Sequence, residues 1–168
     1  TKFIRGKLLY FLSVEQFVDF LYQYQAQSRS VIEQVLNLSC EEKQNMLSAL
    51  RINSTEEKRY YRYDFLYDNC TTRARDITGD QTSSALAFKN ILPEEVPSFR
   101  DLIHSYLDAG HQPWSKLGID MLLGVKLDKK VTNEEAMFLP DYLLKGFDSA
   151  TVAGRPLVQQ KQTILPIP

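Results

Sequence analysis

Residues 61–76 read YRYDFLYDNCTTRARD and are the most informative part of the chain. The aromatic residues of 59–67 partly alternate with other types, a pattern that suits a pleated, half-buried surface and predicts a strand. Asp68 and Asn69, which follow, are both favourable helix caps. We therefore expect a strand that leads through a cap into a short helix headed by Cys70, with the helix ending near residue 79.

Helix-start signals recur on both sides of this stretch. A Ser or Thr followed three residues later by an acidic residue or Gln is the capping-box pattern that opens a helix. Four pairs fit it, namely Ser13 with Gln16, Ser39 with Glu42, Ser98 with Asp101 and Thr132 with Glu135. Each pair predicts a helix that begins directly after its first member.

Apolar spacing fills in the remaining elements. Strands are expected over 7–12 and 30–38, and a helix over 14–26. The helix after Ser39 should bury Met46, Leu47 and Leu50, and further helices should begin at Pro113 and Asp141. Residues 80–97 should form a loop, and the tail over 152–167 an edge hairpin or an exit linker. Helices mixed with a small antiparallel sheet, without regular β-α-β alternation, indicate one α+β domain over 1–168.

Composition excludes several classes of function. The net charge is −1 and no long block of one sign occurs, so the chain lacks the basic footprint of a nucleic-acid-binding protein. No apolar window reaches the length of a membrane span. The two cysteines and two histidines are not closely paired, so we expect no metal site and no cofactor.

Cys70 is the candidate nucleophile. Unpaired backbone N–H groups and the helix dipole at a helix N-terminus favour a thiolate, which is the reactive form of cysteine. The same amides can bind the oxyanion that develops during acyl transfer. Arg73 and Arg75 lie within two turns and would add positive potential if they faced the sulfur.

Other interpretations of the cysteines remain open at this point. Cys70 could be a buried, inert residue, or it could form a disulfide with Cys40, which also follows a capping residue. A thiol nucleophile usually needs a base. His104 lies among apolar residues of a helix, whereas His111 lies in a loop and is the more available of the two histidines.

The motif Tyr63-x-Phe65-x-x-Asp68-Asn69-Cys70-Thr71-Thr72-Arg73-x-Arg75-Asp76 resembles the signature of a bacterial family found in Bacteroidetes and Proteobacteria, the Lnb N-terminal periplasmic domain. Residues 29–39 are similar to the segment before the first central helix of that family. Residues 113–124 and 137–140 are similar to its C-terminal blocks. The resemblance covers nearly the whole chain.

The resemblance implies a periplasmic thiol enzyme with a papain-like arrangement, permuted or not, similar to NlpC-type proteins. One branch is associated with N-acylation of lipoproteins and carries transmembrane helices after such a domain. By that analogy Cys70 would accept an acyl chain from a phospholipid or lipoprotein as a thioester and pass it to an amine. Asn69, Thr71 and Arg73 would then support the thiol and the oxyanion, and the full-length protein would be anchored in the membrane.

The chain departs from the family pattern in one respect. The family places a histidine upstream of the cysteine, whereas no histidine precedes His104 here. We therefore expect the chain to be a fragment whose base lies upstream, with His111 as the internal candidate. The functional alternatives are a papain-like amidase or peptidase of the cell wall, and a non-catalytic binding module held by a Cys40–Cys70 disulfide.

Overall fold

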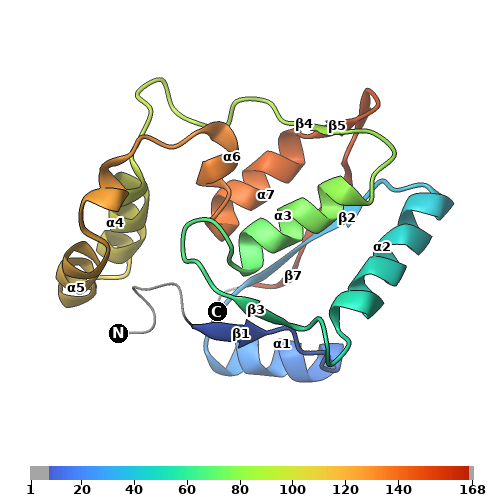
Figure 1. The fold of residues 1–168 in the computed structure, drawn as a ribbon, viewed down its shortest axis with the longest axis horizontal. Helices are drawn as coiled ribbons and strands as arrows, with labels where there is room; N and C mark the ends of the chain where they lie inside the picture. Colours follow the sequence, from blue (N-terminus) through green and yellow to red (C-terminus); the bar gives the residue numbers. More distant parts are fainter. Residues whose placement is uncertain (1–7, 167–168) are drawn as a thin grey trace.

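The computed structural model describes residues 8–166 and has the expected α+β fold (Figure 1). The α-helices are α1 (Phe17–Ala26), α2 (Cys40–Asn53), α3 (Cys70–Asp80), α4 (Phe99–Ala109), α5 (Pro113–Leu123), α6 (Asn133–Ala136) and α7 (Pro140–Ser149), and a 3₁₀ helix, η1, spans Gly124–Asp128. The strands are β1 (Leu9–Phe11), β2 (Val31–Leu36), β3 (Tyr60–Arg62), β4 (Leu86–Ala87), β5 (Thr151–Val152), β6 (Arg155–Pro156) and β7 (Val158–Leu165).

The strands of residues 8–166 form three small antiparallel sheets. β1 pairs with β3, β2 pairs with β7, and β4, β5 and β6 form a three-stranded sheet. The start of the tail forms the predicted edge hairpin, because β5 pairs with β6 and β6 lies at the edge of its sheet. The rest of the tail is not a linker, because β7 pairs with β2 from the other end of the chain. The Gln34 side chain of β2 donates to the Leu144 carbonyl of α7 at 2.9 Å, which fixes α7 against this ribbon. The papain-like arrangement that the resemblance implies stays a prediction.

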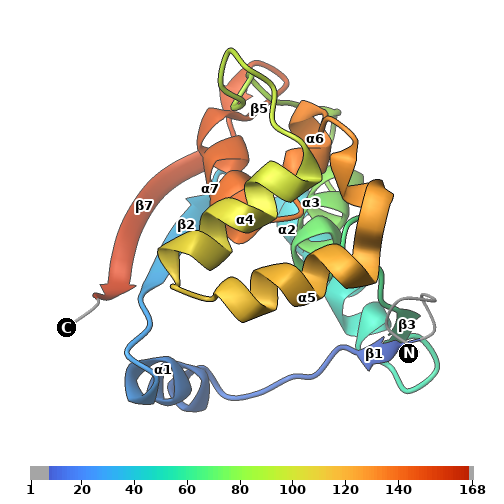
Figure 2. The ribbon, with the colours of Figure 1, turned by 90° about the vertical axis from the view of Figure 1, so that its left-hand side faces the viewer.

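Two clusters of buried apolar side chains hold the helices around α3. The first joins the turn before α3 to α4, η1 and α6, and contains Leu66, Phe99, Leu102, Ile103, Leu127, Val131, Ala136 and Phe138. The second joins α7 to β5 and to the start of β7, and contains Phe147, Ala150, Val152 and Leu157. Figure 2 shows α4 and α5 packed against each other on one side of the molecule, and α1 apart from the helices of the core.

Most predicted helix starts are confirmed. The capping boxes at Ser39, Ser98 and Thr132 are formed in full, with the side chain of each accepting from the backbone N–H three residues later. The box predicted at Ser13 is wrong, because α1 begins at Phe17 after Gln16, whose side chain makes no capping bond. The loop over 80–97 contains the short strand β4.

The start of α2 is fixed by one buried carboxylate, Glu42, which is 2% exposed. Besides closing the capping box, it accepts from the backbone and side chain of Ser83 at 2.9 and 2.7 Å. Arg155, from β6, donates to both of its oxygens at 2.9 and 2.8 Å. These bonds hold the pKa of Glu42 far below its ordinary value of 4.5. One side chain thus joins α2, the loop after α3 and β6.

The apolar face of α2 is not buried as predicted. Leu47 and Leu50 are 48% and 42% exposed, and Met46 is half-buried. All three line cavities instead of packing into a core cluster. The spacing of these residues predicts the helix correctly, but the prediction that they are buried is wrong.

Candidate active site

A tight turn delivers the chain to Cys70. Asp64 and Asp68 exchange both backbone hydrogen bonds at 3.0 Å, which closes the turn. One carboxylate oxygen of Asp64 accepts from the backbone N–H groups of Leu66 and Tyr67 at 2.9 and 3.0 Å. This Asx-type bonding is a local property of the sequence, and it sets the direction from which the chain enters α3.

Asn69 holds the start of α3 from within the core. It is 4% exposed, and its side-chain oxygen accepts from the backbone N–H groups of Thr71 and Thr72 at 2.8 and 3.0 Å. Its side-chain nitrogen donates to the carbonyls of Phe65 and Phe138 at 2.9 and 3.0 Å. Both ends of the amide are therefore occupied, so the role that the structure gives Asn69 is to position the helix.

This bonding leaves one helix-start amide beside the thiol. The amides of Thr71 and Thr72 point to Asn69 and not to a ligand. The first amide of a helix has no acceptor within the helix, and no described residue accepts from the N–H of Cys70. The donor available for an oxyanion is therefore the amide of Cys70 itself.

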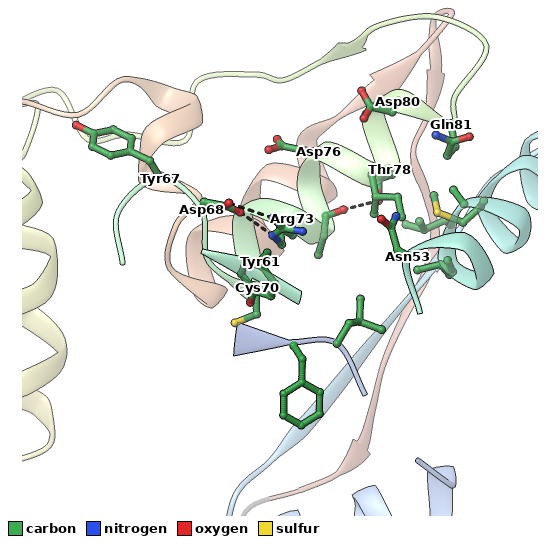
Figure 3. A pocket seen from close by; sticks show the side chains of 18 residues that line it. Asn53, Tyr61, Tyr67, Asp68, Cys70, Arg73, Asp76, Thr78, Asp80 and Gln81 are labelled. Atoms are coloured by element: carbon green, nitrogen blue, oxygen red, sulfur yellow. Dashed lines mark hydrogen bonds and ion pairs between the residues drawn. The ribbon is translucent and has the colours of Figure 1, made fainter. Parts of the chain in front are cut away.

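Cys70 is the first residue of α3, and its thiol is free and exposed. It lies at one end of a cavity of about 910 Å³ that extends between α3 on one side and α2 with β1 on the other. Figure 3 shows Cys70, Tyr61, Arg73 and Asp68 together at this end, and Asp80 and Gln81 at the other end. The Sγ atom is 3.9 Å from the Oγ1 of Thr71, whose side chain is buried.

Arg73 provides a fixed positive charge at the same end of the cavity. Its guanidinium donates twice to the Asp68 carboxylate, at 2.6 and 3.0 Å, and lies 3.7 Å from the centroid of the Tyr61 ring. Because Arg73 is three residues after Cys70, the two side chains share one face of α3. Arg75 turns the other way and donates to the Glu134 carbonyl at 2.8 Å. The structure thus shows that Arg73 lines the cavity at Cys70 and that Arg75 does not, a difference that the sequence does not reveal.

Two tyrosines complete the surroundings of the thiol. Tyr61 lines the cavity, and burial raises its pKa, with a smaller contribution from the charge of Cys70. Burial also raises the pKa of Tyr63 to about 12, and again the charge of Cys70 contributes. Both phenols are therefore protonated at neutral pH and can stabilise negative charge, but they cannot serve as bases there.

Neither histidine lies at the cavity beside Cys70. Nε2 of His104 is 2.9 Å from Asp120, which also pairs with Arg100, so this histidine belongs to the contact between α4 and α5. His111 is exposed in the turn between the same two helices, with a positive φ of 51°. Among residues 8–166, no histidine lines the cavity at Cys70.

Cys40 does not pair with Cys70. Both thiols are free and exposed, and Cys40 is the first residue of α2, where it lines none of the cavities described here. The interpretation of the chain as a module held by a Cys40–Cys70 disulfide is therefore wrong. The two helix-start cysteines, indistinguishable by position, differ in their surroundings, because the cavity lies beside Cys70.

The cavity walls are the functional feature that sequence reasoning missed. The wall facing α3 is mostly apolar and consists of Phe11, Leu12, Leu36, Met46, Ala49 and Leu50, with Asn53 as its polar member. These residues come from β1, the segment after it, β2 and α2, and only their packing makes one surface, so no spacing in the sequence reports them. Within residues 8–166, no group of side chains could hold a metal ion and no helix is long and apolar enough to cross a membrane.

Comparison with known proteins supports the resemblance noted in the sequence. No curated protein and no solved structure matches the chain. The family model of the Lnb N-terminal periplasmic domain matches residues 1–107, a stretch that includes Cys70, Arg73 and the capped start of α3. Because this match covers more than half of the 168 residues, the chain belongs to the family of Lnb N-terminal periplasmic domains.

Proposed function

We propose that this domain is a thiol acyltransferase of the bacterial periplasm and that Cys70 is its nucleophile. The observation that carries the proposal is the placement of one exposed thiol at the first position of a rigidly capped helix, at the end of a large cavity and beside Arg73. Nucleophilic cysteines need an accessible setting of this kind, whereas structural cysteines are usually buried.

The reaction has two steps. In the first, the Cys70 thiolate attacks the carbonyl of an acyl ester, the S–C bond forms, the C–O bond breaks, and the alcohol leaves with a proton. In the second, an amine attacks the thioester, the N–C bond forms, the C–S bond breaks, the amine nitrogen gives up one proton to the base, and the thiolate is restored. Each step passes through an oxyanion, which the Cys70 amide and the charge of Arg73 would stabilise.

We place the base outside the residues described here. His104 is bound to Asp120, and the phenols of Tyr61 and Tyr63 carry raised pKa values. His111 lies in the turn between α4 and α5 and does not line the cavity. A group outside residues 8–166 would then accept the thiol proton and return it to the leaving alcohol, with a phospholipid as acyl donor and a lipoprotein amine as acceptor.

The test uses the complete protein with a dipalmitoyl phospholipid as donor and a diacylglyceryl lipopeptide with a free N-terminus as acceptor. Mass spectrometry follows both the N-acylated lipopeptide and a palmitoyl thioester on the protein. We expect Cys70→Ala to abolish both products and Cys40→Ala, its matched control, to retain them. N-acylation at the wild-type rate in Cys70→Ala would end the proposal.

Hydrolysis is the second candidate, and the exposure of Cys70 to solvent favours it. Water would then replace the amine in the second step. Release of palmitate without N-acylated lipopeptide, dependent on Cys70, would identify the domain as a hydrolase. Parallel incubation with cell-wall fragments, followed by labelling of new amine ends, would identify an amidase.

A further inference from the structure

The cavity at Cys70 continues into a second one along α2. The second cavity, of about 580 Å³, is lined by residues of α1, α2 and the segment between β1 and α1. Leu12 and Leu50 line both cavities, so the two are contiguous. We call them together the α2 groove. Its first part runs beside α3 from Cys70 to Asp80, ten residues apart and therefore about 15 Å along the helix.

The α2 groove is mostly apolar on the sides formed by α1, α2 and β1. Beyond the wall already described, it is lined by Val14, Phe17, Phe20 and Leu47, and its polar members are Ser13, Glu15, Arg51 and Ser54. Phe11, Val14 and Phe17 are 55%, 82% and 56% exposed, values that are high for such large apolar side chains. A contiguous patch of exposed apolar side chains of this kind is typical of a binding site.

Three polar side chains of α3 that line the cavity are engaged with protein partners, whereas Asp80 and Gln81 lie at its far end (Figure 3). Arg73 pairs with Asp68, and Asp76 pairs with Arg75. The Thr78 hydroxyl donates to the Ala74 carbonyl at 2.7 Å. A peptide needs hydrogen-bond partners along its backbone, whereas a hydrocarbon needs only apolar surface. The groove therefore fits a hydrocarbon chain better than a polypeptide.

We propose that the α2 groove binds the hydrocarbon chain of the acyl group that is delivered to Cys70. The proposal deepens the proposed function and rests on it for the carbonyl chemistry at the thiol. The carbonyl lies at Cys70 and Arg73, and the chain extends past Met46, Ala49 and Leu50 toward Phe17. A cavity of this volume lies within the range of sites for drug-sized ligands.

The test measures chain-length preference without requiring catalysis. N-ethylmaleimide and N-dodecylmaleimide, the latter below its micelle concentration, alkylate the thiols of the full chain, and peptide mass spectrometry gives separate rates for Cys70 and Cys40. We expect the dodecyl reagent to label Cys70 at least about tenfold faster than the ethyl reagent, a gain that two buried methylene groups would supply. Cys40, outside the groove, should show no such preference.

Two variants of α2 form a matched pair. Ala49→Trp fills the groove and should reduce the dodecyl preference at Cys70 to about that of Cys40, whereas Ser48→Trp, one position away and outside the lining, should retain it. Equal ethyl and dodecyl rates at Cys70 in the wild type would overturn the proposal. The proposal would also be overturned if a maleimide attached to an apolar hexapeptide labelled Cys70 faster than the ethyl reagent while the dodecyl reagent did not. A peptide would then be the occupant of the groove.

The two proposals can fail separately. Loss of acyl transfer with a retained dodecyl preference would leave the groove as a hydrocarbon site and remove the transferase. Acyl transfer by Cys70 without any dodecyl preference, and equally fast with acetyl and palmitoyl donors, would retain the enzyme and remove the groove.

Discussion

The side-chain nitrogen of Asn69 donates to the carbonyl oxygen of Phe138 across 3.0 Å and a sequence separation of 69 residues. The same side chain caps α3 through its oxygen. This one amide therefore connects the helix that carries Cys70 to the chain between α6 and α7, in a place where water does not reach it. The orientation of the thiol depends on that connection.

Asn69→Ala should lower the free energy of unfolding by about 2–4 kcal/mol, since it removes a cap and the side-chain donor to the carbonyls of Phe65 and Phe138. Urea denaturation followed by circular dichroism gives this value. Asn69→Asp keeps the capping oxygen but lacks the amide donor, so its loss should be dominated by the carbonyls of Phe65 and Phe138. If Asn69→Asp were as stable as the wild type, those two bonds would be unimportant.

Arg73→Ala should reduce kcat for acyl transfer by roughly 100-fold with little change in KM for the donor, the pattern expected when charge stabilisation of an oxyanion is lost. Arg75→Ala is the matched control, because Arg75 contacts Glu134 and Asp76 and not the surroundings of the thiol. Steady-state kinetics with the phospholipid donor distinguish the two. Equal effects of the two substitutions would show that general positive charge matters, and not the position of Arg73.

Glu42→Gln should destabilise the fold by about 2 kcal/mol, because it removes the buried carboxylate that Arg155 binds, and the partial exposure of Arg155 to solvent lessens the cost of its unpaired charge. Arg155→Met removes the other partner and should cost a comparable amount. Thermal unfolding at pH 7 measures both variants. A double variant markedly more stable than either single variant would confirm that the unpaired charge, and not lost packing, causes the effect.

The same carboxylate gives stability a definite pH dependence. The pKa of Glu42 is lowered by folding, so its contribution is fully present above its ordinary value of 4.5 and is lost as the pH falls below that value. We expect the free energy of unfolding to decrease between about pH 4.5 and pH 2, and Glu42→Gln to show a shallower decrease over that interval. If the free energy of unfolding fell equally steeply with pH in the wild type and in Glu42→Gln, Glu42 would not be the source of the pH dependence.

Gly146→Ala should destabilise α7 although alanine is the better helix former. A Cβ atom at this position would overlap the Sδ atom of Met137, which is fully buried, and overpacking of this kind costs about 1–3 kcal/mol. Gly118→Ala in α5 is the matched control, since nothing lies within 4 Å of its Cβ position, and it should stabilise by up to about 1 kcal/mol. Urea denaturation of both variants measures whether the free energy of unfolding falls for Gly146→Ala and rises for Gly118→Ala.

Several parts of the fold and the site could be predicted from local sequence. The starts of α2, α3, α4 and α6 follow from side chains that bond backbone groups within three residues, and such bonds form in nearly any context. The position of Cys70 at a helix start follows for the same reason. The predicted box at Ser13 fails because the chain stays irregular up to Gln16 before α1 begins, and nothing nearby in the sequence signals this.

What the sequence alone determined, then, is the α+β class, the helix that begins at Cys70 and the family. Long-range packing is what makes Met46 and Leu50 line a groove instead of a core, brings Arg73 and not Arg75 to the cavity at Cys70, and leaves Cys40 outside it. Helix caps depend on neighbours a few residues away. Cavity walls, buried ion pairs and thiol partners depend on contacts between segments up to about a hundred residues apart, whose geometry is set by the packing of the whole domain.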